Sequence, residues 1–300
     1  MVNHGAWLKH LTQCQSISRR EAVRFMCVSQ PNAGTFLNAV PKLKGFRMPT
    51  WALRLQMQRR LGLPLLAATA AAGRRSRHGR LFDSLGDVAA ADGESGHQTR
   101  HFLINKAVFD ALRRVYGGQA RREPDNYYGY SNHRPDIALL VEGNLTALDL
   151  KVFDPLGSEP AKADERGAYV AFGNTEEAAN ARVLGRLERV GDGRYNRRTG
   201  VGPVAAVTSD YERALQAGVR CVPMLVETFG GFGPGLMGVL RQADDWRQGR
   251  LVSSEYDETT WAARSYMAFV TQRISVAIHI SLAQEIAEAL GLSVAADPRE

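Results

Sequence analysis

The chain has 300 residues, of which 44% are hydrophobic and 23% charged, so it can bury a substantial core. Its three cysteines are too few for a disulfide framework, which indicates a reducing compartment. No apolar run reaches the roughly 18 residues that a membrane-spanning helix needs. We therefore expect neither a disulfide-rich secreted domain nor a membrane protein.

The net charge of +7 is unevenly distributed. Residues 1–82 hold 14 Lys and Arg but one acid, Glu21, which is an excess of 13 positive charges. Such asymmetry is typical of a basic arm that binds a polyanion such as nucleic acid. A solvated tail and an organelle-targeting segment, which is also rich in arginine and poor in acids, stay open as alternatives.

The first 95 residues are expected to form a helical and irregular basic extension. The stretch "TWALRLQMQRRLGLP" (50–64) has the pattern of a short amphipathic helix that stops at Gly62 and Pro64. The following "LLAATAAAGRRSRHGR" is interpreted as an exposed connection. A clear helix is predicted over residues 96–118, because apolar residues recur at steps of three and four before a Gly-Gly stop. These apolar residues are Ile104, Val108, Leu112 and Val115.

Beyond that helix, the pattern predicts a short strand at 119–123, a hairpin, and a helix at 176–190. A short helix at 209–218, with Ser209 as its N-cap, precedes a strand at 219–231. Pro223 argues against a central position for that strand. Helices at about 234–248 and 258–290 follow, and the last of these is expected to pack along one side.

The hairpin stretch "RPDIALLVEGNLTALDLKVFDP" (134–155) carries Asp136, Asp149 and Lys151 within apolar runs. If Gly143-Asn144 forms the turn, Asp136 lies opposite Lys151 and diagonal to Asp149. The three charged side chains then share one face and the apolar residues the other, with opposed pairs about 5 Å apart. Two such carboxylates can share a metal ion. The alternative is a salt bridge between Asp136 and Lys151, with Asp149 at the sheet rim.

The stretch "RPDIALLVEGNLTALDLKV" resembles the PD-(D/E)xK motif of restriction-enzyme-like nucleases. The wider chain resembles the restriction-like endonuclease domain of retroelement (reverse transcriptase) polyproteins. This likeness depends on several short stretches in the expected order over roughly residues 36–280: "FLNAVP", "RLGLPL", "GD", "TRH", "ALDLKVFDPL" and "VPMLVETFGGFGP".

The resemblance implies an α/β restriction-endonuclease-like core of a helix, a mixed sheet with a central hairpin, and flanking helices. On this interpretation residues 96–231 form the core, and 232–300 a C-terminal helical region packed on it. The implied activity is Mg²⁺- or Mn²⁺-dependent DNA cleavage. Asp136 and Asp149 would be the metal ligands, and Lys151 would orient the attacking water and stabilise phosphate charge.

The implied partner is DNA, with RNA and a reverse transcriptase or other protein partner left open, in an intracellular, nuclear setting. Relatives tend to carry a Cys/His cluster between "RLGLPL" and "TRH", where this chain has no cysteine, so no zinc site is expected. Relatives often have Asn where this chain has Phe102. The competing hypothesis is a catalytically silent nuclease fold that acts as a nucleic-acid-binding or scaffold subunit.

Further candidates surround the hairpin. Glu123 is either a third acid of the site or a surface residue beside its arginine neighbours. His101 either approaches the phosphate or is a packed or surface histidine. The residues predicted to bind nucleic acid are Arg100, His101, Arg121, Arg122 and Arg134.

Overall fold

The computed structural model of the chain describes residues 4–40, 46–91, 96–124, 134–156, 211–258 and 263–292. The N-terminal helices are α1 (His4–Ile17), α2 (Arg19–Val28), η1 (Thr35–Asn38), α3 (Thr50–Arg60), α4 (Leu66–Ala71) and α5 (Asp87–Ala91). The later helices are α6 (Gly96–Tyr116), η3 (Gly117–Gln119), α9 (Glu212–Gln216), α10 (Pro234–Arg247), α11 (Ser253–Glu258) and α12 (Tyr266–Ala289). The strands are β1 (Ala120–Arg122), β2 (Ile137–Val141), β3 (Asn144–Phe153) and β4 (Arg220–Glu227).

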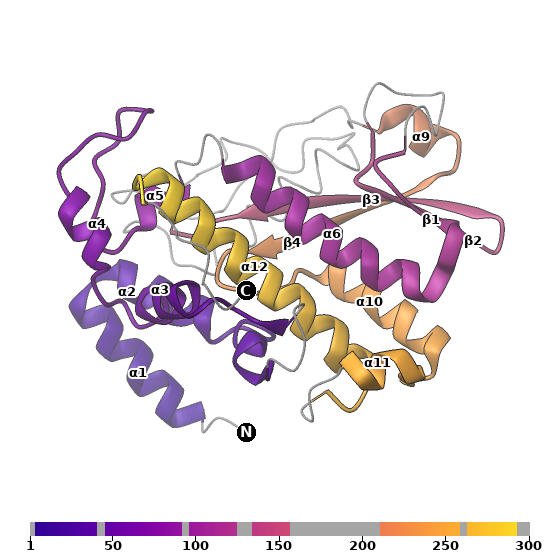
Figure 1. Cartoon of the computed structure of the whole chain (residues 1–300), viewed down its shortest axis with the longest axis horizontal. Helices are drawn as coiled ribbons and strands as arrows, with labels where there is room; N and C mark the ends of the chain where they lie inside the picture. Colours follow the sequence, from indigo (N-terminus) through magenta and orange to yellow (C-terminus); the bar gives the residue numbers. More distant parts are fainter. Residues whose placement is uncertain are drawn as a thin grey trace, which may run out of the picture.

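The four strands form one open mixed sheet in the order β1-β2-β3-β4, so the chain is an α/β protein (Figure 1). The first three strands are antiparallel neighbours, and β4 runs parallel to β3. Pro223 lies in β4, which pairs only with β3 within the described sheet. An edge strand tolerates a proline because its outward N–H needs no partner in the ladder.

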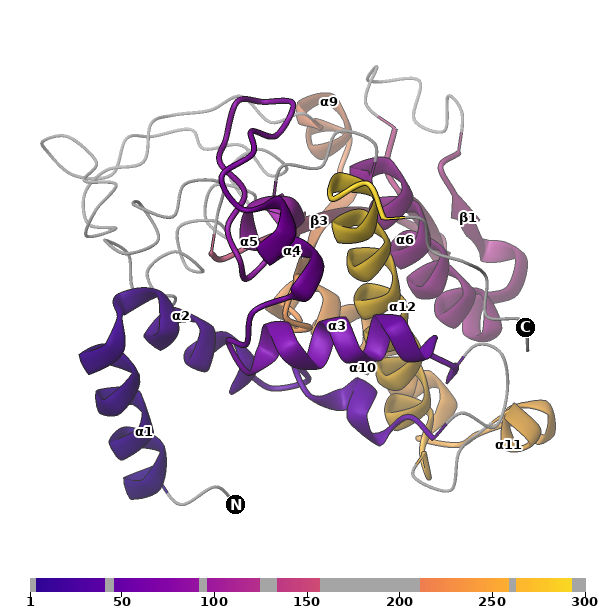
Figure 2. The same ribbon diagram turned by 60° about the vertical axis from the view of Figure 1, so that its left-hand side comes forward.

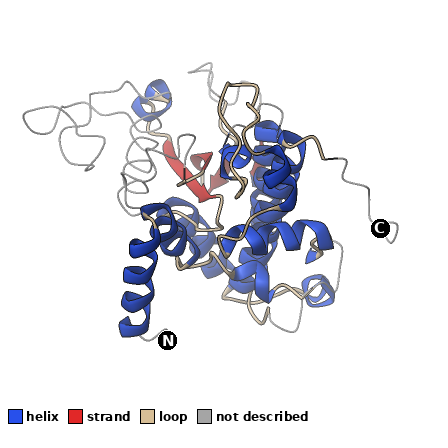
Figure 3. Cartoon of the chain, turned by 90° about the vertical axis from the view of Figure 1, so that its left-hand side faces the viewer, coloured by secondary structure: helices blue, strands red, loops and turns tan. Residues whose placement is uncertain are grey.

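One face of the sheet packs against α6, α10 and α12 and forms the main core (Figure 1). The predicted apolar stripe of α6 faces inward: Ile104, Val108 and Leu112 are fully buried. The opposite face is covered in part by α9, where Tyr211 and Ala214 pack on strand residues. Figure 3 shows that helices surround the sheet on several sides.

Helix α12 differs from the prediction that it packs along one side. Its N-terminal half belongs to the core of the sheet, while Leu282 and Ile286 in its C-terminal half pack against α3, α4 and α5 (Figure 2). Polar side chains within it, including Gln272 and Glu285, are also buried. The last helix therefore forms as predicted, but it is enclosed on more than one side. Among the described residues, no helix is both long and apolar enough to cross a membrane.

The basic N-terminal segment is held to the rest of the chain by buried ion pairs. Asp87 of α5 is fully buried and accepts hydrogen bonds from Arg20 and Arg24 of α2 at 2.6–3.4 Å. Arg59 of α3 is also fully buried and pairs with Asp154, just after β3, at 2.6 Å. Much of the positive charge in this segment therefore stabilises the fold, and these parts do not form a solvated tail.

The hairpin forms, but the predicted register is wrong. Ile137 pairs with Leu148 and Val141 with Asn144, so the turn residues are Glu142 and Gly143. Both have positive φ, 50° and 77°, as a tight hairpin turn requires. Pairing is thus shifted by two residues, and Asp136 does not lie opposite Lys151. An even shift leaves the side chains within β2 and β3 on their predicted faces, but Asp136 precedes β2 and does not share the face of Asp149 and Lys151.

The short strand at 119–123 is confirmed as β1, the strand at 219–231 as β4, and the helix at 234–248 as α10. The predicted helix at 176–190 and the N-cap Ser209 lie outside the described residues. The predicted domain boundary at residue 95 lies between α5 and α6, both of which contact α12.

Candidate active site beside the end of strand β2

The site lies beside the N-terminal end of β2, where β3 extends beyond its partner strand. Strand β2 begins at Ile137, opposite Leu148, whereas β3 extends to Phe153. The backbone of Leu150 therefore lacks a partner in β2, and two side chains satisfy it. Its N–H donates to Oδ2 of Asp136 at 2.5 Å, and its carbonyl oxygen lies 3.3 Å from Nε2 of His101. The loss of strand pairing thus creates a polar site on an otherwise apolar hairpin.

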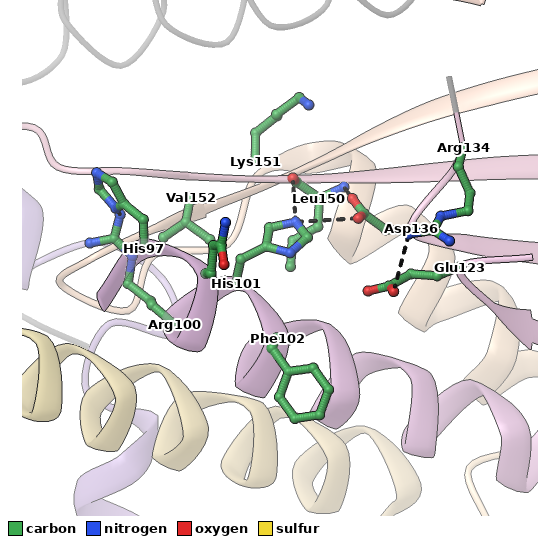
Figure 4. Close-up of a pocket in the computed structure, with 11 residues that line it drawn as sticks. His97, Arg100, His101, Phe102, Glu123, Arg134, Asp136, Leu150, Lys151 and Val152 are labelled. Atoms are coloured by element: carbon green, nitrogen blue, oxygen red, sulfur yellow. Dashed lines mark hydrogen bonds and ion pairs between the residues drawn. The ribbon is translucent and has the colours of Figure 1, made fainter. Parts of the chain in front are cut away.

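His101 of α6 points directly at this opening (Figure 4). Its Nε2 lies 3.3 Å from Oδ1 of Asp136 and 3.3 Å from the carbonyl oxygen of Leu150. The hydrogen bond with Asp136 raises the pKa of His101 above its ordinary value, although burial acts against this. Two oxygen atoms, one from Asp136 before β2 and one from Leu150 of β3, therefore converge on the imidazole of His101.

Asp149 and Lys151 lie on the other face of β3. Lys151 Nζ is 2.8 Å from Oδ2 of Asp149, and Tyr211 donates to Oδ1 across 3.3 Å. Burial raises the pKa of Asp149, and the negative charge of Asp136 adds to this, while Lys151 and Tyr211 oppose it. Figure 4 shows the Lys151 side chain leaving β3 on the side opposite His101. The three motif residues thus surround the edge of β3 and do not share one flat surface.

An open pocket of about 750 Å³ contains the His101 side of this site. It is lined by His97, Gln98, Arg100, His101, Phe102, Glu123, Arg134, Asp136, Leu150, Lys151 and Val152. Basic residues outnumber acidic ones in its lining, and the two acids, Glu123 and Asp136, lie toward β1 and β2 (Figure 4). An anionic ligand can therefore approach the carboxylate of Asp136 through a positively charged entrance.

Glu123 adds a second acid to this pocket. Its backbone N–H donates to the carbonyl oxygen of Asp136 at 2.9 Å, and its own φ is +42°. Its carboxylate accepts a hydrogen bond from Asn105 Nδ2 at 3.4 Å and lies 3.7 Å from Arg134. Asn105 is fully buried, and its Oδ1 has no hydrogen-bond partner among the described residues.

The residues predicted to bind nucleic acid have different environments. Arg134 and His101 line the pocket, and Arg122 stacks on the ring of Phe102 at 4.7 Å. Arg121 is exposed on β1 outside the pocket lining. Arg100 is only 4% exposed, because it donates to Glu285 at 2.6 Å and to the carbonyl oxygen of Ala90. Nucleic-acid binding by each of these residues stays a prediction.

Two residues of the site were missed from the sequence. Tyr211 follows a long intervening segment, and nothing near it in the sequence indicates a contact with Asp149 62 positions earlier. The place of Asn105 could have been predicted, because it follows His101 by four positions and so lies on the same face of α6.

The donors present fit a hard divalent cation. The carboxylates of Asp136 and Asp149 and the carbonyl of Leu150 supply oxygen atoms, which Mg²⁺ prefers. The negative charge of Asp136 raises the pKa of Asp149, and a cation between them would relieve that repulsion. No group of three His, Cys, Asp or Glu side chains in the described ranges is arranged to hold a metal. Two carboxylates nonetheless suit Mg²⁺, because it usually keeps several of its own waters.

Comparisons with models of protein families, with curated proteins and with solved structures returned no match for this chain.

Proposed function

We propose that this chain is a metal-dependent DNA endonuclease with a restriction-endonuclease-like core. The observation that carries the proposal is the carboxylate of Asp136 on the backbone of Leu150, next to Asp149 in the chain of β3 and near enough to raise the pKa of Asp149, beside an open pocket with a positive wall. The arrangement of α6, the antiparallel β1–β3 and the parallel β4 also supports it, because it contains the helix and mixed sheet with a hairpin that the motif implies.

In this proposal Asp136 and Asp149 hold Mg²⁺ or Mn²⁺, with the carbonyl of Leu150 as a further oxygen donor. When bound, the metal polarises the phosphoryl group and lowers the pKa of a coordinated water. Glu123 is the third acid in the pocket lining, and Asn105 and Arg134 contact its carboxylate.

Lys151 supplies the positive charge that the reaction needs on the β3 side. Its side chain is 37% exposed, so a phosphate can reach the ammonium without a change in the fold. An ammonium there stabilises the negative charge that develops on the phosphate oxygens. Nicking of target DNA for a mobile element, a nuclear location and a polymerase partner belong to the same proposal.

A scaffold function without catalysis is the second candidate. The observation that favours it is that Asp149 already has protein partners on both oxygens, Lys151 and Tyr211. A buried carboxylate satisfied in this way can serve stability alone. In that case Asp149 and Lys151 form a structural ion pair, and the protein binds nucleic acid without cutting it.

The Asp149→Asn variant separates the two functions. As an endonuclease, wild-type protein nicks plasmid DNA with Mg²⁺ or Mn²⁺ and not with EDTA, and the variant loses nicking while still binding DNA. Lys151→Ala also loses nicking, but it keeps the carboxylates and should still bind metal. Asp110→Asn, at an exposed pair with Lys106, is the matched control and should nick normally. Wild-type protein that never nicks, with an Asp149→Asn variant that melts several degrees lower, would establish the scaffold function instead.

A further inference from the structure

Residues 73–82, hereafter the basic hairpin, are largely exposed, as expected from the sequence, and form a turn closed by one antiparallel bridge. Phe82 donates its N–H to the carbonyl of Arg74 at 3.0 Å, and Ser76 donates to that of Arg80 at 2.7 Å. Arg75 and Leu81 form an antiparallel bridge between these pairs. Gly79 has φ +78°, which allows the chain to reverse at the tip.

The basic hairpin carries a dense positive charge. Arg74, Arg75 and Arg77 are exposed, Arg80 is partly exposed, and no acid occurs between residues 73 and 82. The next acid in the chain is Asp83. Its carboxylate accepts the backbone N–H groups of Leu85, Asp87 and Val88 at 2.7–3.2 Å and so caps the start of α5.

Several other arginines of the N-terminal segment are committed to the fold, although Arg47 and Arg54 are exposed. Arg24 and Arg59 are at most 2% exposed and pair with buried acids. Arg60 donates to the backbone carbonyls of Ala33 and Phe229 at 2.7 and 3.2 Å. Part of the positive charge excess of residues 1–82 is therefore buried in ion pairs, and another part is exposed on the basic hairpin.

The basic hairpin lies at the end of the molecule where α6 begins (Figures 1 and 2), and the first residues of α6 line the pocket. It leads directly into α5, whose residue Ala90 accepts a hydrogen bond from Arg100 of the pocket wall at 3.3 Å. Figures 1 and 2 both show the segment after α4 extending outward on the side where α6 begins. A long polyanion that enters the pocket can thus continue along the hairpin.

We propose that the basic hairpin binds the phosphate backbone of duplex DNA beside the cleavage site. The choice of DNA as substrate rests on the proposed function. Guanidinium groups form paired hydrogen bonds with phosphate oxygens, so an exposed turn that carries several of them can follow the DNA backbone. The hairpin anchors the duplex, while the pocket receives the phosphate to be cut.

The test is a matched pair of triple variants of the full chain. Arg74→Gln, Arg75→Gln and Arg77→Gln neutralise the basic hairpin. Arg220→Gln, Arg241→Gln and Arg250→Gln remove the same charge from exposed positions on β4, on α10 and just after α10. Binding to a labelled DNA duplex is measured by fluorescence anisotropy in EDTA over a range of salt concentrations, so that no cleavage is needed.

The hairpin triple should weaken binding on the order of tenfold and lower the slope of log affinity against log salt by about 1 to 3, because each lost phosphate contact removes about 0.9 from that slope. The control triple should change affinity less than about twofold. Replacing the same three arginines by lysine should restore most of the slope, which separates lost charge from misfolding. Equal effects of the two Gln triples, or a wild-type slope for the hairpin triple, would overturn the proposal. A slope change seen only with an RNA duplex would overturn the assignment to DNA.

Failure of the proposed function is distinguishable from failure of this inference. If wild-type protein does not nick DNA in Mg²⁺ but the hairpin triple loses its salt slope, DNA binding by the basic hairpin is supported and the endonuclease activity is contradicted. If wild-type protein nicks DNA and the hairpin triple binds DNA like wild type, the endonuclease activity is supported and DNA binding by the basic hairpin is contradicted.

Discussion

The hydroxyl of Tyr211 donates a hydrogen bond to Oδ1 of Asp149 across 3.3 Å. Tyr211 is 3% exposed and Asp149 6%, so this contact is shielded from water. The same hydroxyl lies 3.4 Å from the carbonyl oxygen of Arg134, two residues before Asp136. One side chain from the start of α9 therefore connects both segments that carry the acids. In the proposed endonuclease it fixes the orientation of the Asp149 carboxylate, which is a positioning role.

Tyr211→Phe should raise the Mg²⁺ concentration for half-maximal nicking about tenfold, because groups that orient a metal ligand affect metal affinity by roughly 10- to 100-fold. The maximal rate should fall less than the metal affinity. Tyr266→Phe is the control, since it removes an equally buried hydrogen bond, 2.9 Å to Ala111, within the main core. It should cost similar stability, about 1 kcal/mol, without changing the metal requirement. Equal metal curves for the two variants would contradict a positioning role.

The confirmed predictions were those that depend on residues close together in the sequence. Alternation along β3 placed Asp149 and Lys151 on one face and Leu148 and Leu150 on the other. The register was wrong because "EGN" offers two adjacent two-residue turns, and alternation fits both equally well. Choosing between them depends on the backbone of Glu142, whose positive φ is uncommon for a non-glycine residue.

Contacts between distant segments could not be predicted from the sequence. Residues 1–82 were predicted to be a single charged arm, because the acids that pair with their arginines, Asp87 and Asp154, lie outside this range. Arg100 likewise appeared to belong to the polar face of its helix, whereas Glu285 of α12 pairs with it from 185 positions away. Periodicity reports which face is buried, but it does not report which charges meet there.

Asp87→Asn should destabilise the protein by about 3 to 5 kcal/mol. Burial alone would raise the pKa of Asp87, but the guanidinium groups of Arg24, Arg59 and Arg20 outweigh burial and lower it. Removing its charge leaves buried arginines without compensation, which is the costly way to break an ion pair. Asp110→Asn, at the exposed Lys106 pair, should cost about 0.5 kcal/mol or less. Urea unfolding measures both, and similar losses would contradict this account.

Two glycines of α10 should respond in opposite directions to alanine. A Cβ at Gly235 would lie 2.0 Å from the carbonyl oxygen of Pro223, so helix and strand would have to separate. We expect Gly235→Ala to lose about 2 kcal/mol or more. Gly238 is exposed, with no atom within 4 Å of such a Cβ, and Gly238→Ala should gain about 1 kcal/mol because alanine favours a helix. Thermal melting of the two variants tests the sign of each effect.

Two buried titratable groups near the N-terminal segment give opposite dependences on pH. Burial raises the pKa of Glu227 from 4.5 to about 7, so the folded state holds an extra proton between these values and loses stability as pH rises through them. Burial lowers the pKa of His279 from 6.5 to about 3, so the unfolded state holds the extra proton in that range. Stability from His279 is therefore lost as pH falls below 6.5. Between 4.5 and 6.5 the two contributions oppose each other.

Glu227→Gln should expose the contribution of His279. With the acid removed, the free energy of unfolding should rise with pH between about 5 and 6, by up to about 1.4 kcal/mol per pH unit relative to wild type, because one proton is then bound in excess by the unfolded state. Urea unfolding at both pH values gives this difference directly. Glu142→Gln, at the exposed hairpin turn, should leave the wild-type dependence unchanged. If Glu227→Gln also keeps the wild-type dependence, Glu227 is ionised in the folded protein at these pH values, and its burial must be offset by the neighbouring Arg59 and Arg60.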